Sequence, residues 1–167
     1  MIGTERASPE WPWPEERLTY DNARIPEAML AAGAALSRPR LAKDGLSLLR
    51  WLVGVETRGD HFSFVPVGGW VQPEPRPAFD QQPIEAAGVA DACARAWELT
   101  GDPSWKEVVV RAAAWILGDN DVGVPLYDPD TEGCCDGLEP TGVNRNQGAE
   151  STLAMITTFQ QVRRLAG

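Results

Sequence analysis

Cysteine and histidine are scarce in this 167-residue sequence, with three and one respectively, and this limits the sites it can build. The cysteines, Cys93, Cys134 and Cys135, are odd in number and lack the paired spacing of a metal site. Small secreted domains use even sets of cysteines in disulfides, so this pattern favours a reducing compartment. We therefore predict a cytoplasmic protein with no disulfide framework, no metal site and no cofactor.

Long apolar runs and an excess of basic residues are also missing. No segment approaches the roughly 20 apolar residues of a membrane span, and residues 1–16 are polar and rich in Pro and Trp, unlike a secretory signal. The formal net charge is −9, whereas nucleic acids and anionic membranes attract basic surfaces. We expect a soluble domain whose partners include neither nucleic acid nor membrane, and whose surface suits a neutral ligand.

Three glutamates share one position, at the head of an Ala-rich segment after a polar approach: Glu27, Glu85 and Glu150. Three residues before each stands a long hydrogen-bonding side chain: Arg24, Gln82 and Gln147. The spacings of 58 and 65 residues between successive glutamates leave room for a helix, a connection and a second helix. The pattern therefore predicts a degenerate repeat of helical hairpins, which gathers the same helix end on one face.

A second pattern marks the other helix of each hairpin. Pro39 and Pro103 each precede a tryptophan by 12 residues, and Trp105 opens an apolar stripe at helical spacing. These features predict amphipathic outer helices at 39–56 and 103–118. The Glu-headed segments are instead apolar or small around most of their circumference, which is typical of buried helices.

The predicted fold is all-α, a partial α/α toroid of about five main helices with long loops. Its inner helices are expected near 24–36, 82–100 and 147–165. A short β-like hairpin segment is expected in the alternating run at 61–70. We predict an extended Trp/Pro-rich segment at 1–20 and the toroid domain at 21–167.

Several motifs together resemble a known family: Trp11-Pro12-Trp13-Pro14, Leu18-Thr19-Tyr20-Asp21-Asn22-Ala23-Arg24, His61-Phe62-Ser63-Phe64, Phe79-Asp80-Gln81-Gln82-Pro83-Ile84-Glu85-Ala86 and Asn146-Gln147-Gly148-Ala149-Glu150-Ser151-Thr152. Over residues 9–165 the chain resembles the C-terminal helical region attached to many bacterial family 4 glycosyltransferases. Pro14 departs from that pattern, which has Phe there. The region is similar in architecture to the six-hairpin glycosidase toroids. The resemblance implies a carbohydrate ligand and, as a partner, N-terminal glycosyltransferase domains. No part of this sequence reads as such a domain, since no G-x-G-x-x-G motif is present.

Five helices make less than half of a six-hairpin ring. We therefore expect a fragment of a longer protein or a ring that closes by self-association. Either arrangement leaves the apolar flank of the first or last inner helix exposed until something covers it.

Glycosidic-bond chemistry needs two carboxyl groups across the scissile bond. The predicted catalytic candidates are Asp80 or Glu85 opposing Glu139 or Glu150, with acid and base unassigned; Glu27 and Asp136 widen the choice of carboxylates. Amide, guanidinium and aromatic side chains bind sugars. The predicted substrate-binding residues, with Gln82 and Gln147 favoured for a pocket, are Asp21, Asn22, Arg24, His61, Trp70, Gln82, Tyr127, Asn146 and Gln147.

Structural alternatives stand beside these roles. A carboxylate in the first turn of a helix is stabilised by the helix dipole without any chemistry, and a lone histidine such as His61 is more often a hydrogen-bonded structural group. The segment 128–139 places acids as in an EF-hand loop, but its flanks carry Gly and Pro instead of helices, so a plain acidic loop is favoured over calcium. Of the adjacent Cys134 and Cys135, we expect one to be packed and one to face solvent.

Three functions stay open from the sequence. The first is a carbohydrate-active domain that binds or acts on a glycan. The second is a non-catalytic glycan-binding or scaffold module that docks on glycosyltransferase domains, and the third is a truncated fragment without independent activity. Two acids roughly 5–10 Å apart across an open cleft favour catalysis, whereas acids buried against backbone amides or Arg favour a structural role.

Overall fold

The computed structural model of the protein describes residue 8 and residues 10–167, so part of the predicted segment 1–20 lies outside the described residues. Within the described part of the chain there are five helices: α1 (Arg24–Ala35), α2 (Pro39–Val55), α3 (Pro83–Thr100), α4 (Ser104–Ile116) and α5 (Ala149–Ala166). The predicted bounds agree with these to within two residues.

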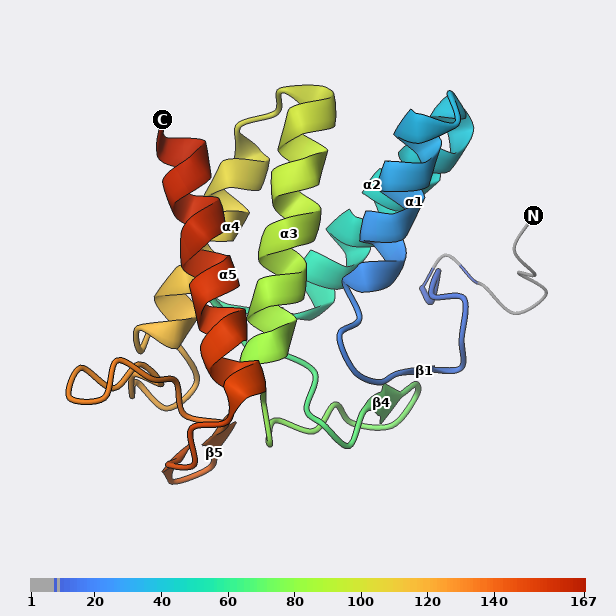
Figure 1. Ribbon diagram of the computed structural model, residues 1–167. Coiled ribbons are helices and arrows are strands. Elements are labelled where there is room, and N and C mark those ends of the chain that lie inside the picture. Colours follow the sequence, from blue (N-terminus) through green and yellow to red (C-terminus); the bar gives the residue numbers. More distant parts are fainter. Residues whose placement is uncertain (1–7, 9) are drawn as a thin grey trace.

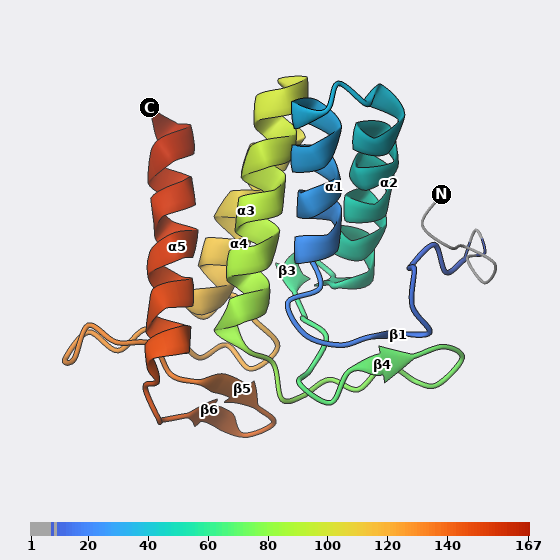
Figure 2. The same ribbon diagram turned by 45° about the vertical axis from the view of Figure 1, so that its right-hand side comes forward.

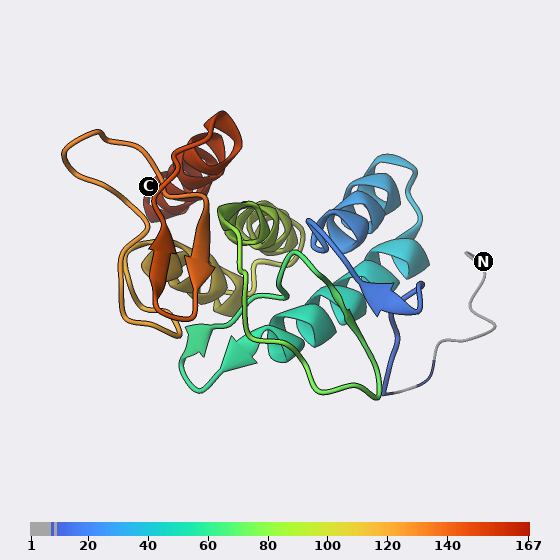
Figure 3. The ribbon, with the colours of Figure 1, turned by 90° about the horizontal axis from the view of Figure 1, so that it is seen from below.

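The helices form two layers. Figures 1 and 2 show α1, α3 and α5 in one row and running in the same direction, with α2 and α4 returning behind them. Seen from below, the two rows follow a shallow arc (Figure 3). Helix α3 packs against α1, α4 and α5, and α1 packs against α2. The fold is a partial α/α toroid, as predicted.

Helix α3 is the buried centre of the inner row. Its small residues allow close neighbours, and most of it is buried, from Pro83 to Ala96. The expectation of burial all round is wrong for α1, which buries only Pro26, Leu30 and Gly33, and for α5, most of whose residues are not buried. Because α1 packs mainly against α2 and α3, its Ala-rich far side faces solvent.

Among the described residues, three two-stranded antiparallel sheets lie toward the end where the inner helices begin (Figures 1 and 2). They pair β1 (Arg17–Leu18) with β4 (Trp70–Val71), β2 (Thr57–Arg58) with β3 (His61–Phe62), and β5 (Gly137–Glu139) with β6 (Gly142–Asn144). The strand-like run predicted at 61–70 therefore contributes two strands that belong to different sheets.

The described part of the N-terminal segment packs onto the toroid. The ring of Trp11 lies edge-on to Trp51 of α2 and to Trp70 of β4, with 5.3 Å between ring centroids in each pair. Trp13 stacks on Trp51 at 6.0 Å, and Leu18 is fully buried. The side chains of Trp11, Trp13 and Leu18 belong to the same hydrophobic core as the helices. The domain boundary at residue 20 stays a prediction. Among the described residues, no helix combines the length and apolar character needed to cross a membrane.

Candidate functional site

The candidate site is the helix-head face, which we define as residues 19–27, 79–85 and 136–150, at the start of α1, α3 and α5. The structure places Glu27, Glu85 and Glu150 in the first turns of these helices. Their partners differ, however, so the repeated glutamates do not repeat one role.

Glu85 is buried and holds the chain that leads into α1. One carboxylate oxygen accepts a hydrogen bond from the backbone N–H of Asp21 at 2.5 Å, and the other accepts from the N–H (3.2 Å) and the Nδ2 (3.4 Å) of Asn22. Burial raises the pKa of Glu85 to about 7, although these hydrogen bonds oppose the rise. This geometry favours the structural alternative for Glu85 and Asn22.

A further buried carboxyl, Glu56, was missed by the sequence analysis. It follows α2, is fully buried, and accepts a hydrogen bond from the N–H of Val65 at 3.4 Å, while its Oε2 has no hydrogen-bond partner. Burial raises its pKa, and the charge of Glu85 raises it further. A Glu in a polar stretch after a helix gives no local sign of burial, so only long-range packing could have revealed it.

Arg24 links the start of α1 to the middle of α3. Its guanidinium donates to Asp21 (2.9 Å), to Glu27 (2.9 Å) and to Asp91 (2.7 Å). Burial raises the pKa of Asp21, against the effect of Arg24. The Oδ1 atom of Asp21 is buried without a hydrogen-bond partner, beside the Cα of Gly88, where any side chain would collide with it.

Asp80 and Glu139 flank a short antiparallel backbone pairing on its two segments. Gln81 and Leu138 exchange two hydrogen bonds, of 3.1 and 2.8 Å, in an antiparallel bridge. In such a bridge the flanking residues Asp80 and Glu139 stand opposite one another. The two predicted catalytic candidates are thus brought together from segments 59 residues apart in the sequence.

The Asp80 carboxyl has an unusual environment. Its Oδ1 is buried without a hydrogen-bond partner and lies over Gly137, where an added Cβ would come within 2.5 Å of it. Burial raises the pKa of Asp80, and the charge of Glu139 adds to the rise. Burial and a second carboxyl group therefore act on the pKa of Asp80 in the same direction.

Glu150 is exposed and is contacted by a residue that the sequence analysis did not single out. The Tyr20 hydroxyl donates to its Oε2 at 2.6 Å, and the Tyr20 ring is 45% exposed. Burial and then Glu150 raise the pKa of Tyr20. The only sequence signal for Tyr20 was its place beside Asp21 in the motif before α1.

Other candidates anchor the long loop to α5. The Gln147 amide donates to Asp128 at 2.8 Å and accepts from the Thr131 hydroxyl at 2.7 Å. Asp136 accepts from the N–H of Gly148 at 2.7 Å and from the Asn146 side chain. The predicted pocket role of Gln147 therefore competes with a structural one.

The acidic loop has no EF-hand geometry. Asp128 accepts a hydrogen bond from the N–H of Asp130, Asp136 is bonded to Gly148 outside the loop, and β5 occupies the last residues of the loop. In the part of the chain that the structure describes, no three His, Cys, Asp or Glu residues are grouped so that they could hold a metal ion. Cys134 and Cys135 are both buried and neither forms a disulfide, so the expectation that one faces solvent is wrong. The segment pairs with residues 126–127, and both cysteine side chains belong to the hydrophobic core.

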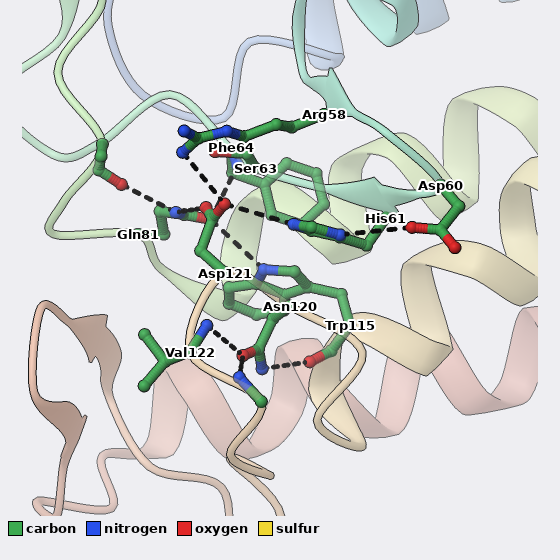
Figure 4. Close-up of polar contacts among 12 residues, drawn as sticks. Arg58, Asp60, His61, Ser63, Phe64, Gln81, Trp115, Asn120, Asp121 and Val122 are labelled. Carbon is green, nitrogen blue, oxygen red and sulfur yellow. Dashed lines mark hydrogen bonds and ion pairs between the residues drawn. The ribbon is translucent and has the colours of Figure 1, made fainter.

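His61 belongs to a separate polar network (Figure 4). Its Nε2 lies 3.2 Å from Asp121 Oδ1, and Asp121 Oδ2 accepts from Gln81 Nε2 at 2.6 Å. Against the effect of burial, hydrogen bonds from Ser63, Gln81 and His61 lower the pKa of Asp121. The Gln81 side-chain oxygen accepts from the indole N–H of Trp115 at 3.2 Å. The network ties β3 and the α4–β5 loop to the start of α3 and contains none of the predicted catalytic acids.

The remaining substrate-binding candidates are Trp70, Tyr127 and Gln82. Trp70 donates from its indole N–H to the Glu74 carbonyl at 2.7 Å, and Tyr127 is half-buried opposite Cys134. Gln82 is half-buried at the N-cap of α3 and makes no side-chain capping hydrogen bond there.

Comparison of the sequence with protein-family profiles and with curated protein sequences gives no match. Among solved structures, the chain is similar to a GH76 alpha-mannanase from Bacteroides thetaiotaomicron, with a TM-score of 0.67 and 14% sequence identity. The similarity covers 89% of this chain and 39% of that one. The mannanase has an α/α-toroid glycosidase fold, so the likeness confirms the fold. The predicted attachment to glycosyltransferase domains stays a prediction.

Proposed function

We propose that this partial α/α toroid is carbohydrate-active and that its helix-head face binds a glycan, with Asp80 and Glu139 as the carboxylate pair. The observation that carries the proposal is their juxtaposition across the Gln81–Leu138 bridge, with one Asp80 oxygen unpaired. Two carboxyl groups in different environments, one of them with a raised pKa, are the arrangement that glycosidic-bond chemistry uses. The similarity in fold to an alpha-mannanase supports the same class of ligand.

In this proposal Asp80 donates the proton that a leaving glycosidic oxygen needs, and Glu139 activates water or stabilises the anomeric carbon. Glu150 and the Tyr20 ring add an acceptor and a stacking surface next to the start of α1. Glu85 stands outside the pair because its oxygens are occupied by the backbone of Asp21 and Asn22.

The test is a glycan array that includes α-mannans, followed by calorimetry and a hydrolysis assay, on the wild type and on Asp80→Asn and Glu139→Gln. Each substitution removes an ionisable oxygen that can bond a sugar hydroxyl, so we expect about a tenfold loss of affinity or more. Asp44→Asn on α2 and Glu107→Gln on α4 change exposed acids away from the site and are the matched controls. The absence of glycan binding by folded wild type, or equal losses in the controls, would contradict the proposal.

A second candidate function is a module that docks on glycosyltransferase domains. It is favoured by two exposed apolar side chains on α5, Leu153 and Ile156, which are 61% and 42% exposed. Binding of such domains by a chain that binds no glycan would select this alternative.

A further inference from the structure

A polar groove of about 330 Å³ lies between the inner helices and reaches the helix-head face only at Glu27. It is lined by Glu27, Asp91, Arg95, Glu98, Gln161 and Arg164. At 1.5 Å per residue, Arg95 stands about 18 Å along α3 from its first residue. The groove is therefore a different place from the Asp80–Glu139 pair.

All three inner helices point polar residues into this groove. On α3, Asp91, Arg95 and Glu98 recur at the spacing of one helix face, in a helix that is otherwise built mainly of Ala, Val and other apolar residues. On α5, Gln161 and Arg164 do the same with a spacing of three residues.

The side chains form one continuous chain of donors and acceptors. Arg164 pairs with Glu98 and donates from Nε to Gln161 at 2.9 Å, and Gln161 donates to Asp91 at 2.7 Å. Asp91 also accepts from Arg24 at 2.7 Å. Glu27 then receives hydrogen bonds from Arg24 at 2.9 Å and from Arg95 at 3.3 Å.

This series of hydrogen-bonded side chains leaves some hydrogen-bonding capacity unused. The Arg95 side chain is 40% exposed, and its Nε is buried without a hydrogen-bond partner. Three carboxylates and two arginines line the groove, and a third arginine, Arg24, pairs with two of these carboxylates, so charges of both signs alternate along the wall. Ion pairs that only held the helices together would need no groove between them, and exposed ion pairs stabilise a fold only weakly.

We propose that this groove is a second ligand site, and that it binds a neutral polyhydroxylated ligand of the size of a mono- or disaccharide. A sugar hydroxyl both donates and accepts, so neighbouring hydroxyls match an alternating row of Arg and carboxylate groups. The volume lies in the range of small-molecule pockets, at the low end of roughly 300–1,000 Å³. An anion would meet Glu27, Asp91 and Glu98, and a metal ion would have to displace their arginine partners.

The experiment is NMR titration of the full chain with methyl α-mannoside, mannobiose and glucose. The Nε–H signal of Arg95 and the side-chain amide of Gln161 serve as reporters. We expect saturable shifts of both signals with at least one sugar. Arg164→Gln should weaken binding about tenfold, because it removes donors at one end of the groove. Arg163→Gln, in the same turn but exposed and outside the groove, should leave binding unchanged.

Two further variants keep the result unambiguous. Arg95→Gln, with folding checked by circular dichroism, should abolish the Gln161 shift. Asp80→Asn should leave the groove shifts unchanged, so this site and the helix-head site can fail separately. Absence of saturable groove shifts overturns the inference, and so do groove shifts that follow protein concentration without sugar, which would mean protein association there.

Discussion

At the scale of single residues, several carboxyl groups near the start of α1 and α3 have a pKa that burial raises. Glu85 and Glu56 are almost fully buried, and burial raises the pKa of each. Asp21 shares this behaviour beside Glu85. Glu85 fixes the chain before α1, so its protonation is linked to the stability of that attachment.

The pKa of about 7 for Glu85 lies above its ordinary value of 4.5, so the folded state holds a proton that the unfolded state has already lost. The stabilisation is fully present below about pH 4.5 and is lost as the pH rises to about 7. The free energy of unfolding should therefore fall across this range by on the order of 3 kcal/mol from this group.

Glu85→Gln should flatten that decline, because the amide does not titrate. Urea unfolding at several pH values measures it, with the exposed Glu107→Gln as the control that keeps the wild-type slope. An unchanged slope in Glu85→Gln would show that this carboxyl is ionised in the folded protein.

At the scale of helices, α1 and α2 approach most closely at glycines. A Cβ on Gly33 would lie 2.6 Å from the backbone N of Ala42, and one on Gly45 would lie 3.0 Å from the Met29 Cβ. Backbone atoms cannot move aside as a flexible side chain can, so the first hairpin depends on the absence of a side chain at Gly33.

Gly33→Ala should destabilise the protein by about 1–3 kcal/mol, because the added methyl forces α1 and α2 apart. Gly54 supplies the matched control, since it lies near the end of α2 with open space around its Cα. Gly54→Ala should stabilise by about 0.5–1 kcal/mol through helix propensity alone. Thermal unfolding of the two variants compares them, and equal effects would contradict the close-packing account.

At the scale of the whole molecule, the row of inner helices ends at α5, which exposes an edge of apolar side chains. Leu153 and Ile156 lie one turn apart on α5 and are exposed, whereas Ala154, Met155 and Thr158 on the same helix are buried against its neighbours. The sequence analysis expected such an edge on the first or last inner helix. A small apolar edge of this kind promotes association.

Lys substitutions at both Leu153 and Ile156 should shift the protein toward monomer, with a change in stability within about 0.5 kcal/mol because both side chains are exposed. Sedimentation velocity over a range of concentrations measures the shift. Leu117→Lys, at an exposed leucine after α4, is the control. If the wild type is monomeric at every concentration, or if the control acts equally, the edge does not mediate association.

The sequence by itself determined the helices and their layering. Pro39 and Pro83 lie at the starts of α2 and α3, Gly101 caps α3, and the apolar spacing of each segment sets its buried side; all of these are local signals. The five helix positions and the partial α/α toroid follow from them. The first-turn position of Glu27, Glu85 and Glu150 was readable for the same reason.

Only the tertiary structure decided what each polar residue does. Glu85 turns inward to bind the chain before α1, and Glu56 is buried with no local signal. Asp80 meets Glu139 because Gln81 pairs with Leu138, 57 residues away in the sequence. Helix formation depends on residues within a few positions of one another, so it can be predicted from local sequence. The burial and the partners of a side chain depend on contacts between distant segments, and the local sequence of one segment does not specify the other.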